Sequence, residues 1–162
     1  MRALVMLAIT TALLIAPASL RADNAAATSS FFEQAFLNAG LRITTEDRRG
    51  EEPVRDTMCY EGGIREFVSY INRNKTPLHN GVIYMCGERE NSIAEIAMQY
   101  NDSYNETIVS FANNILTPEG GMHETGFKTA LTRALNAYGK KTNLLKEGES
   151  ISGEDCREGL VC

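Results

Sequence analysis

The sequence lacks any spacing of cysteines and histidines that would hold a zinc ion. Its four cysteines, Cys59, Cys86, Cys156 and Cys162, include no C-x-x-C pair, and its two histidines lie far from each other. Structural zinc sites take their ligands from closely spaced pairs, which excludes a zinc-finger type of protein. We expect four free thiols, because nothing in the sequence brings any two of the cysteines together.

Positive charge is also scarce. The chain has 16 Lys and Arg residues against 21 Asp and Glu residues, which gives a formal net charge of −5. Proteins that hold nucleic acid through its phosphates carry a basic surface, so any DNA contact in this chain must be local. The Gly120-Gly121 pair lacks the Lys-Ser/Thr ending of a Walker A phosphate loop, so we interpret it as a turn into a helix.

The uncharged stretch from Ala3 to Ala16 is too short to cross a bilayer as a stable helix, and we expect no membrane partner. Arg2 precedes this stretch, and Pro17 and small residues follow it, in the order of a secretory signal. A misassigned start is the alternative. The Ala/Thr/Ser-rich residues 24–30 favour a flexible joint. We therefore expect residues 1–30 to be a signal-like or misassigned leader with a joint, and one domain to occupy residues 31–162.

What the chain does contain is ordinary globular composition, with 43% hydrophobic and 23% charged residues. Phe32, Ala35 and Phe36 lie at helical spacing, residues 48–53 are a polar turn, and residues 159–162 look like the opening of a last strand. Strands followed by a helix across them favour an α+β fold, with an antiparallel-rich sheet and helices on one face. The patterns predict strands at 41–46, 54–60, 82–86, 94–100 and 107–112, and helices at 64–71 and 127–138.

The second of these helices has a predicted apolar stripe and a polar side. We expect four polar residues to lie off the stripe: Lys128, Thr132, Arg133 and Asn136. The stripe itself consists of Phe127, Ala130, Leu131, Ala134, Leu135 and Tyr138.

Short blocks of sequence from Phe31 to Cys162 follow one another in the order of a known family. The blocks are FLNAGL at 36–41, YEGGI at 60–64, NRNKTPLH at 72–79, QYND at 99–102, SFANNI at 110–115, GGMH at 120–123, GF at 126–127, LNAY at 135–138 and GEDCREGL at 153–160. They resemble the transducer domain of the DNA gyrase B family of type IIA topoisomerases. The B subunit of topoisomerase IV shares these blocks, so the resemblance leaves the choice between the two enzymes open.

The resemblance implies a left-handed βαβ transducer domain over residues 31–162, incomplete at its C-terminus. Such a domain couples ATP binding in an upstream domain to DNA strand passage and supercoiling. ATP and Mg²⁺ are the implied cofactors of the full-length enzyme, and we expect none to be bound by residues of this chain. The implied partners are DNA, a gyrase A-like protein and a second copy of gyrase B as a homodimer. The implied location is the cytoplasm, which conflicts with the signal-like N-terminus.

The resemblance also implies which residues of this chain contact DNA. An arginine at the place of Arg133 faces a DNA-sized cavity between two subunits in this family, and Lys128 would add positive charge to that cavity. The alternative for both is a solvated helix charge. We expect no catalytic residue and no metal ligand, since Glu61, Asp102, Glu154 and Asp155 are interpreted as surface carboxylates.

Two other functions stay open on the sequence alone. The leader and the four cysteines are compatible with a secreted, disulfide-stabilised binding protein derived from a topoisomerase remnant. An inactive truncated product is the second alternative.

Overall fold

The computed structural model describes residues 31–48 and 52–162. The predicted leader and joint, residues 1–30, and part of the predicted turn, residues 49–51, lie outside the described residues. The chain divides into two compact units, with the boundary between Phe67 and Val68. None of the helices in the two described stretches is long and apolar enough to cross a membrane.

The first unit contains an antiparallel hairpin of β1 (Arg42–Asp47) and β2 (Val54–Cys59), in which Ile43 pairs with Met58. Residues 31–37 precede the hairpin as a helix. The Phe36 ring is fully buried and stacks on the Tyr60 ring at a centroid distance of 3.6 Å. The hairpin was predicted from the sequence pattern and is confirmed. The helical spacing of Phe32, Ala35 and Phe36 agrees with the helix, although no helix was predicted there.

The unit boundary lies within α2 (Ile64–Ile71), which begins after Gly63 in a left-handed conformation with φ of 60°. The predicted i, i+3, i+4, i+7 stripe is confirmed in this helix, and Val68 is its buried residue. The backbone N–H of Gly62 donates to Glu66 Oε2 at 3.1 Å, which supplies a partner at the helix start.

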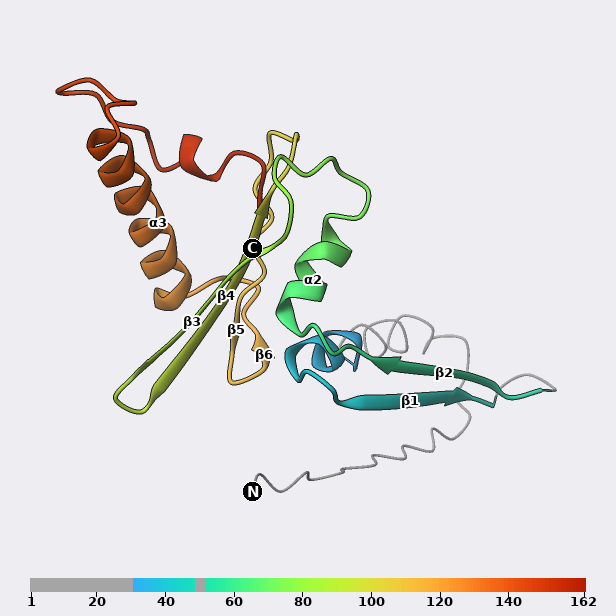
Figure 1. The fold of residues 1–162 in the computed structure, drawn as a ribbon. Helices are drawn as coiled ribbons and strands as arrows, with labels where there is room; N and C mark the ends of the chain where they lie inside the picture. Colours follow the sequence, from blue (N-terminus) through green and yellow to red (C-terminus); the bar gives the residue numbers. More distant parts are fainter. Residues whose placement is uncertain (1–30, 49–51) are drawn as a thin grey trace. The chain divides into compact units, whose positions relative to one another are not determined.

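The second unit is built on a three-stranded antiparallel sheet with the strand order β3-β4-β7. Its strands are β3 (Ile83–Arg89), β4 (Ser92–Tyr100) and β7 (Leu160–Val161) (Figure 1). The β3–β4 hairpin turns at Glu90, whose φ is 55°. β7 pairs with β4 only at the C-terminal end of β4, called the root of the sheet below, where Gln99 lies opposite Val161.

The predicted strand over 107–112 is present only in part, and its first residues pair in parallel with the end of the chain, not as the next strand of an antiparallel meander. Thr107 forms a parallel bridge with Val161, and the Val109 N–H donates to the Cys162 carbonyl at 2.9 Å. Two short strands follow, β5 (Phe111–Ala112) and β6 (Ile115–Leu116). Asn113 and Asn114 have φ of 50° and 63°, so two adjacent left-handed residues reverse the chain between β5 and β6.

The core of the second unit lies between the sheet and α3 (Met122–Lys141). Met98 of β4, Leu160 of β7 and Leu131 of α3 form the buried cluster, and Phe127 and Leu135 pack against it. The fold therefore has the predicted antiparallel-rich α+β arrangement.

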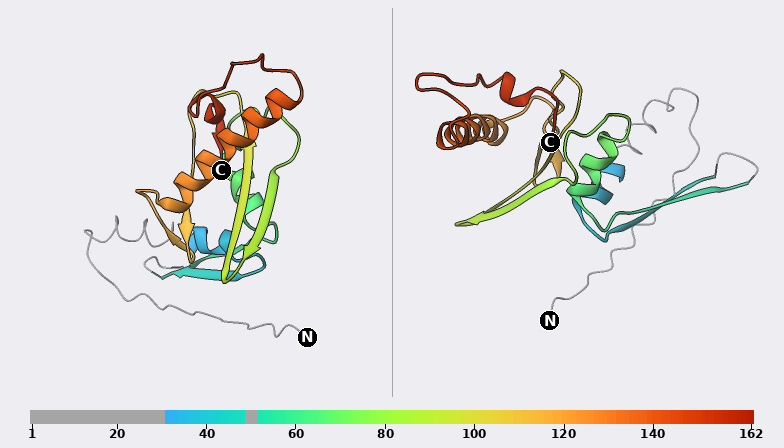
Figure 2. Two further views of the ribbon diagram at one scale, coloured as in Figure 1. Left: turned by 90° about the vertical axis from the view of Figure 1, so that its left-hand side faces the viewer. Right: turned by 45° about the horizontal axis from the view of Figure 1, so that its top comes forward.

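The prediction for the two sides of α3 was partly wrong. Ala130, Ala134 and Tyr138 are exposed, whereas Thr132 and Asn136 are half-buried. The reason is the chain after α3, which runs back beside the helix in both views of Figure 2 and offers polar partners there. Burying a polar side chain costs little free energy when it finds hydrogen-bond partners in the protein.

Candidate functional site

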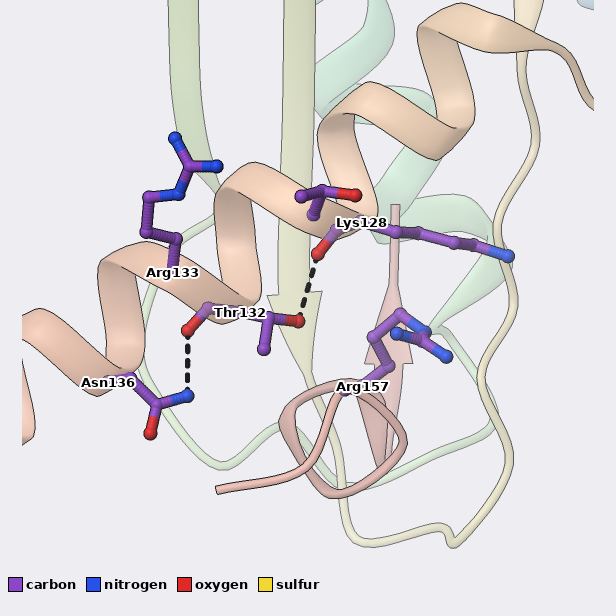
Figure 3. Close-up of a pocket in the computed structure, with 7 residues that line it drawn as sticks. Lys128, Thr132, Arg133, Asn136 and Arg157 are labelled. Atoms are coloured by element: carbon purple, nitrogen blue, oxygen red, sulfur yellow. Dashed lines mark hydrogen bonds between the residues drawn. The ribbon is translucent and has the colours of Figure 1, made fainter. Parts of the chain in front are cut away.

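An open groove of about 440 Å³ lies along one side of α3 (Figure 3). All of its lining residues belong to the second unit. They are Lys128, Thr129, Thr132, Arg133 and Asn136 from α3, and Gly153 and Arg157 from the segment that ends in the short helix η2 (Asp155–Arg157).

The far wall of the groove is held in place by Asn136. Its Nδ2 donates to the carbonyl of Ile151 at 2.9 Å, and its Oδ1 accepts from the Ile151 N–H at 2.8 Å. Next to this double contact, Ser152 Oγ donates to Asp155 Oδ2 at 2.7 Å. The two contacts fix the start of η2, which in turn positions Arg157 at the groove.

Three of the lining residues are cationic, and none of them is acidic. Two of the cations share one carboxylate from outside the groove: Arg157 Nε and Lys128 Nζ both donate to Glu106. Lys128 Nζ also lies 2.9 Å from Glu124 Oε1, one turn earlier on α3. The positive charge of Lys128 and Arg157 is therefore largely matched by two carboxylates.

The pKa values of this cluster move as the contacts require. Partial burial raises the pKa of Glu106, but the hydrogen bonds and charges of Arg157 and Lys128 outweigh it and leave that pKa below 4.5. The hydrogen bond from Lys128, and then that from Ser110, lowers the pKa of Glu124. The hydrogen bond to Glu124 raises the pKa of Lys128. Glu106 and Glu124 are thus ionised, and Lys128 is protonated, near neutral pH.

Arg133 differs from the other two cations. It is exposed, and it makes no hydrogen bond or ion pair to any residue in the described ranges. Its guanidinium points away from Lys128 and Arg157 (Figure 3). A charge without a protein partner is available to an outside anion.

The structure brings both sequence-predicted residues, Arg133 and Lys128, to the same groove. That they contact DNA stays a prediction. Sequence reasoning missed Arg157 and Gly153, because both fall in a polar stretch with no periodic pattern. The GEDCREGL block, which contains both, was the signal that could have pointed to them.

His123 Nε2 is 3.3 Å from Thr117 Oγ1 near the start of α3, and this places it in a contact with the preceding loop. Within residues 31–48 and 52–162, no three His, Cys, Asp or Glu side chains are grouped so that they could hold a metal ion.

Comparison with known proteins gives consistent matches. The family model described as DNA gyrase B matches residues 63–162. The B subunit of DNA gyrase from Bacillus mycoides is 50% identical over 130 residues, which are 80% of this chain and 32% of that protein. The corresponding protein of Halalkalibacterium halodurans is 54% identical over 130 residues, which are 80% of this chain and 20% of that protein. The chain thus spans between a fifth and a third of the length of these relatives.

Two solved structures share the fold. The 43K ATPase domain of Thermus thermophilus gyrase B, in complex with an aminocoumarin, matches with a TM-score of 0.73 and 32% identity over 85% of this chain and 38% of that one. The B-subunit of the DNA gyrase from Myxococcus xanthus matches with a TM-score of 0.72 and 24% identity over 86% of this chain and 38% of that one. The second match supports the fold alone.

Proposed function

Because the chain belongs to the DNA gyrase B family, we propose that residues 31–162 serve as the transducer domain of a type II DNA topoisomerase. In this role the domain links ATP binding elsewhere in the enzyme to passage of one DNA duplex through another. Its own contribution is a rigid support that presents positive charge to the duplex.

The observation that carries the proposal is that Arg133 is exposed on α3 and has no partner among the described residues. It lies in the middle of α3, whose opposite side is packed on the sheet through Leu131. Its guanidinium has no protein partner within the described residues and faces solvent. Arginine on a rigid helix is well suited to phosphate contacts, because its planar fork donates two hydrogen bonds to one phosphate.

The packing of α3 supports the coupling role. Leu131 and Leu135 contact the same core as Met98 of β4, so α3 is packed on the sheet at this point. On this proposal, movement of the sheet reaches Arg133 through that packing contact. This is the property that a lever between a nucleotide site and a DNA site needs.

Lys128 takes a lesser part in the proposal. Its ammonium is already held by Glu106 and Glu124, so a DNA phosphate must compete with two carboxylates for it. We propose that it adds to the local potential and does not bind a phosphate by itself.

The remaining components belong to the whole protein on this proposal. They are ATP, Mg²⁺, duplex DNA, a gyrase A-like partner, a second copy of the same protein as a homodimer, and a cytoplasmic location. The residues that line the groove include no carboxylate and so do not fit Mg²⁺, which prefers oxygen ligands of that kind. No step through the nucleotide is derived from this chain.

The proposal is tested by grafting residues 31–162 into gyrase B within an intact gyrase and comparing Arg133→Gln with the parent graft. We expect DNA-stimulated ATP turnover and supercoiling to fall several-fold, with ATP turnover in the absence of DNA unchanged. Arg89→Gln is the matched control, because Arg89 is an exposed arginine on the β3–β4 hairpin, away from α3. Equal DNA stimulation in the parent, Arg133→Gln and Arg89→Gln grafts would overturn the proposal.

A further inference from the structure

Gly153 leaves more room at the groove than a residue with a side chain would. A Cβ at this position would lie 3.0 Å from Arg157 Nη1 and 3.4 Å from Thr132 Oγ1. Gly153 is not among the glycines with positive φ, so its backbone conformation does not require a glycine. The missing side chain therefore matters for space, and that space is bordered by a guanidinium and a hydroxyl.

Arg157 presents unused donors beside this space. Its side chain is only 17% exposed, and Nε is held by Glu106. Its two Nη groups make no hydrogen bond to any residue that the structure describes. The guanidinium is therefore held in position through Nε, while its Nη groups still lack acceptors. A tetrahedral oxyanion can supply such acceptors, because it accepts two parallel N–H bonds from one arginine.

The charge of the groove fits the same kind of ligand. Its lining contains three cations; Glu106 and Glu124, from outside the lining, match much of the charge of Lys128 and Arg157, and the charge of Arg133 is left unmatched. The volume of about 440 Å³ exceeds what a bare oxyanion needs. The excess leaves room for a group attached to the anion. Ligand sites commonly combine such a concave space with a few fixed polar groups.

We propose that this groove is a binding site for a phosphate group, with the Nη groups of Arg157 as its principal donors and Gly153 providing the room. Lys128 lies on the same side as the Arg157 guanidinium in Figure 3 and adds positive charge there. Arg133 lines the rim and is not required for the contact. The inference stands apart from the topoisomerase assignment, since it concerns binding by this chain alone. The phosphate can come from the backbone of DNA or from free phosphate.

The test is a titration of the full chain, followed by amide and arginine side-chain NMR signals, with inorganic phosphate in one arm and a short DNA duplex in the other. We expect saturable shifts centred on Gly153 and Arg157. Arg157→Gln should weaken binding at least tenfold, and Arg89→Gln should leave it unchanged. If the duplex shifts these signals and inorganic phosphate displaces it, the site takes a phosphate of the DNA backbone. If inorganic phosphate shifts the signals and the duplex does not, the site takes free phosphate.

Gly153→Ala separates binding from folding, because it keeps every charge and only fills the space. We expect weaker phosphate binding in this variant with the signals of the core around Leu131 unchanged. The proposal is overturned if the signals of Gly153 and Arg157 shift neither with inorganic phosphate nor with the DNA duplex. It is equally overturned by undiminished binding in both Arg157→Gln and Gly153→Ala. Neither outcome bears on DNA-stimulated ATP turnover, which tests the proposed function separately.

Discussion

Asn72 and Asn101 lie 29 residues apart, and Asn101 Nδ2 donates to Asn72 Oδ1 at 2.9 Å. Asn72 Nδ2 in turn donates to Gln99 Oε1 at 2.9 Å, so one buried side chain joins two residues at the end of β4. The exposed fraction is 2% for both asparagines and 7% for Gln99. The three amides fix the segment after α2 against the root of the sheet.

The first prediction is that Asn72→Ala lowers the free energy of unfolding by about 2 to 4 kcal/mol. The substitution leaves a buried acceptor on Gln99 and a buried donor on Asn101 without partners, and each costs roughly 1–3 kcal/mol. Urea unfolding followed by circular dichroism measures the change. Asn74→Ala is the control, because Asn74 is exposed on the same segment and should shift stability by less than about 0.5 kcal/mol.

The second prediction concerns Gly159, which has φ of 69°. Gly159 lies against the backbone of residues 101–103, which follow β4. A Cβ there would overlap the carbonyl oxygen of Asn101 and approach that of Ser103 to 2.7 Å. We expect Gly159→Ala to destabilise the fold by about 3 kcal/mol or more, from steric overlap and the left-handed backbone together. Thermal unfolding measures this.

Gly148→Ala is the matched control for that substitution. Gly148 also has a positive φ, 90°, but a Cβ there meets nothing within 4 Å. It should cost only the backbone strain, about 1 kcal/mol. Equal losses in the two variants would show that the overlap with Asn101 is relieved by a shift of the backbone.

The third prediction is an acid-sensitive contribution from Glu106. Its pKa and that of Glu124 are lower in the folded chain than the ordinary value of 4.5. A lowered carboxyl pKa gives stability that is present above about pH 4.5 and is lost as the pH falls through the folded-state pKa. Glu106→Gln should therefore lose less stability than the parent between about pH 5 and pH 3.

Unfolding curves at a series of pH values measure this slope. At neutral pH the difference should be small, because Glu106 is partly exposed and such ion pairs contribute about 1 kcal/mol or less. Glu88→Gln, on the exposed β3 strand, is the control for removing one carboxylate. An identical acid slope for Glu106→Gln and the parent would contradict the prediction.

The fourth prediction concerns the thiols, all of which are free in the structure. Cys59 and Cys86 are exposed, whereas Cys156 is buried. Burial, and next the charge of Glu124, raise the pKa of Cys162 from 9.0 to about 12. Only thiolate reacts, so three pKa units make Cys162 roughly a thousandfold slower than an ordinary thiol near pH 8.

We measure the reaction with a thiol reagent in the absence of reductant. In the native chain, Cys59 and Cys86 should react fast and the other two cysteines slowly, and in urea all four should react. Cys59→Ser and Cys86→Ser should each remove one fast thiol and leave the slow pair. Fewer than four thiols in the denatured monomer would instead favour the secreted, disulfide-stabilised alternative.

The periodic parts of the fold could be predicted because one face of each element meets the core. Alternation located β1 and β4, the polar turn after β1 located β2 as its hairpin partner, and a strand-like run located β3. The i, i+3, i+4 pattern located α2 and α3. The run at 107–112 misled the same reasoning, because its first residues pair in parallel with the end of the chain and its last two belong to a separate hairpin that turns at Asn113-Asn114. Two left-handed asparagines are a local signal that outweighs alternation.

The candidate site was only half predictable. Arg133 and Lys128 could be identified because they lie on a strongly patterned helix within a recognisable block. Arg157 and Gly153 could not, because their place depends on Asn136 binding the backbone of Ile151, a contact between an amide and a loop that no sequence period encodes. The amides of Asn72, Gln99 and Asn101 were missed for the same reason.

The β3–β4 hairpin changes character along its length. β4 is exposed at Ser92 and buried by Gln99, and β7 supports it only at Gln99 and Tyr100. A free-standing pair of strands is at best marginally stable in water. Backbone hydrogen bonds near Glu90 should therefore open often and exchange their amide protons quickly, while those at the root open only with the whole sheet. The hairpin thus has a gradient of local stability, in which its outer half can change partner or conformation without disturbing the core around Met98.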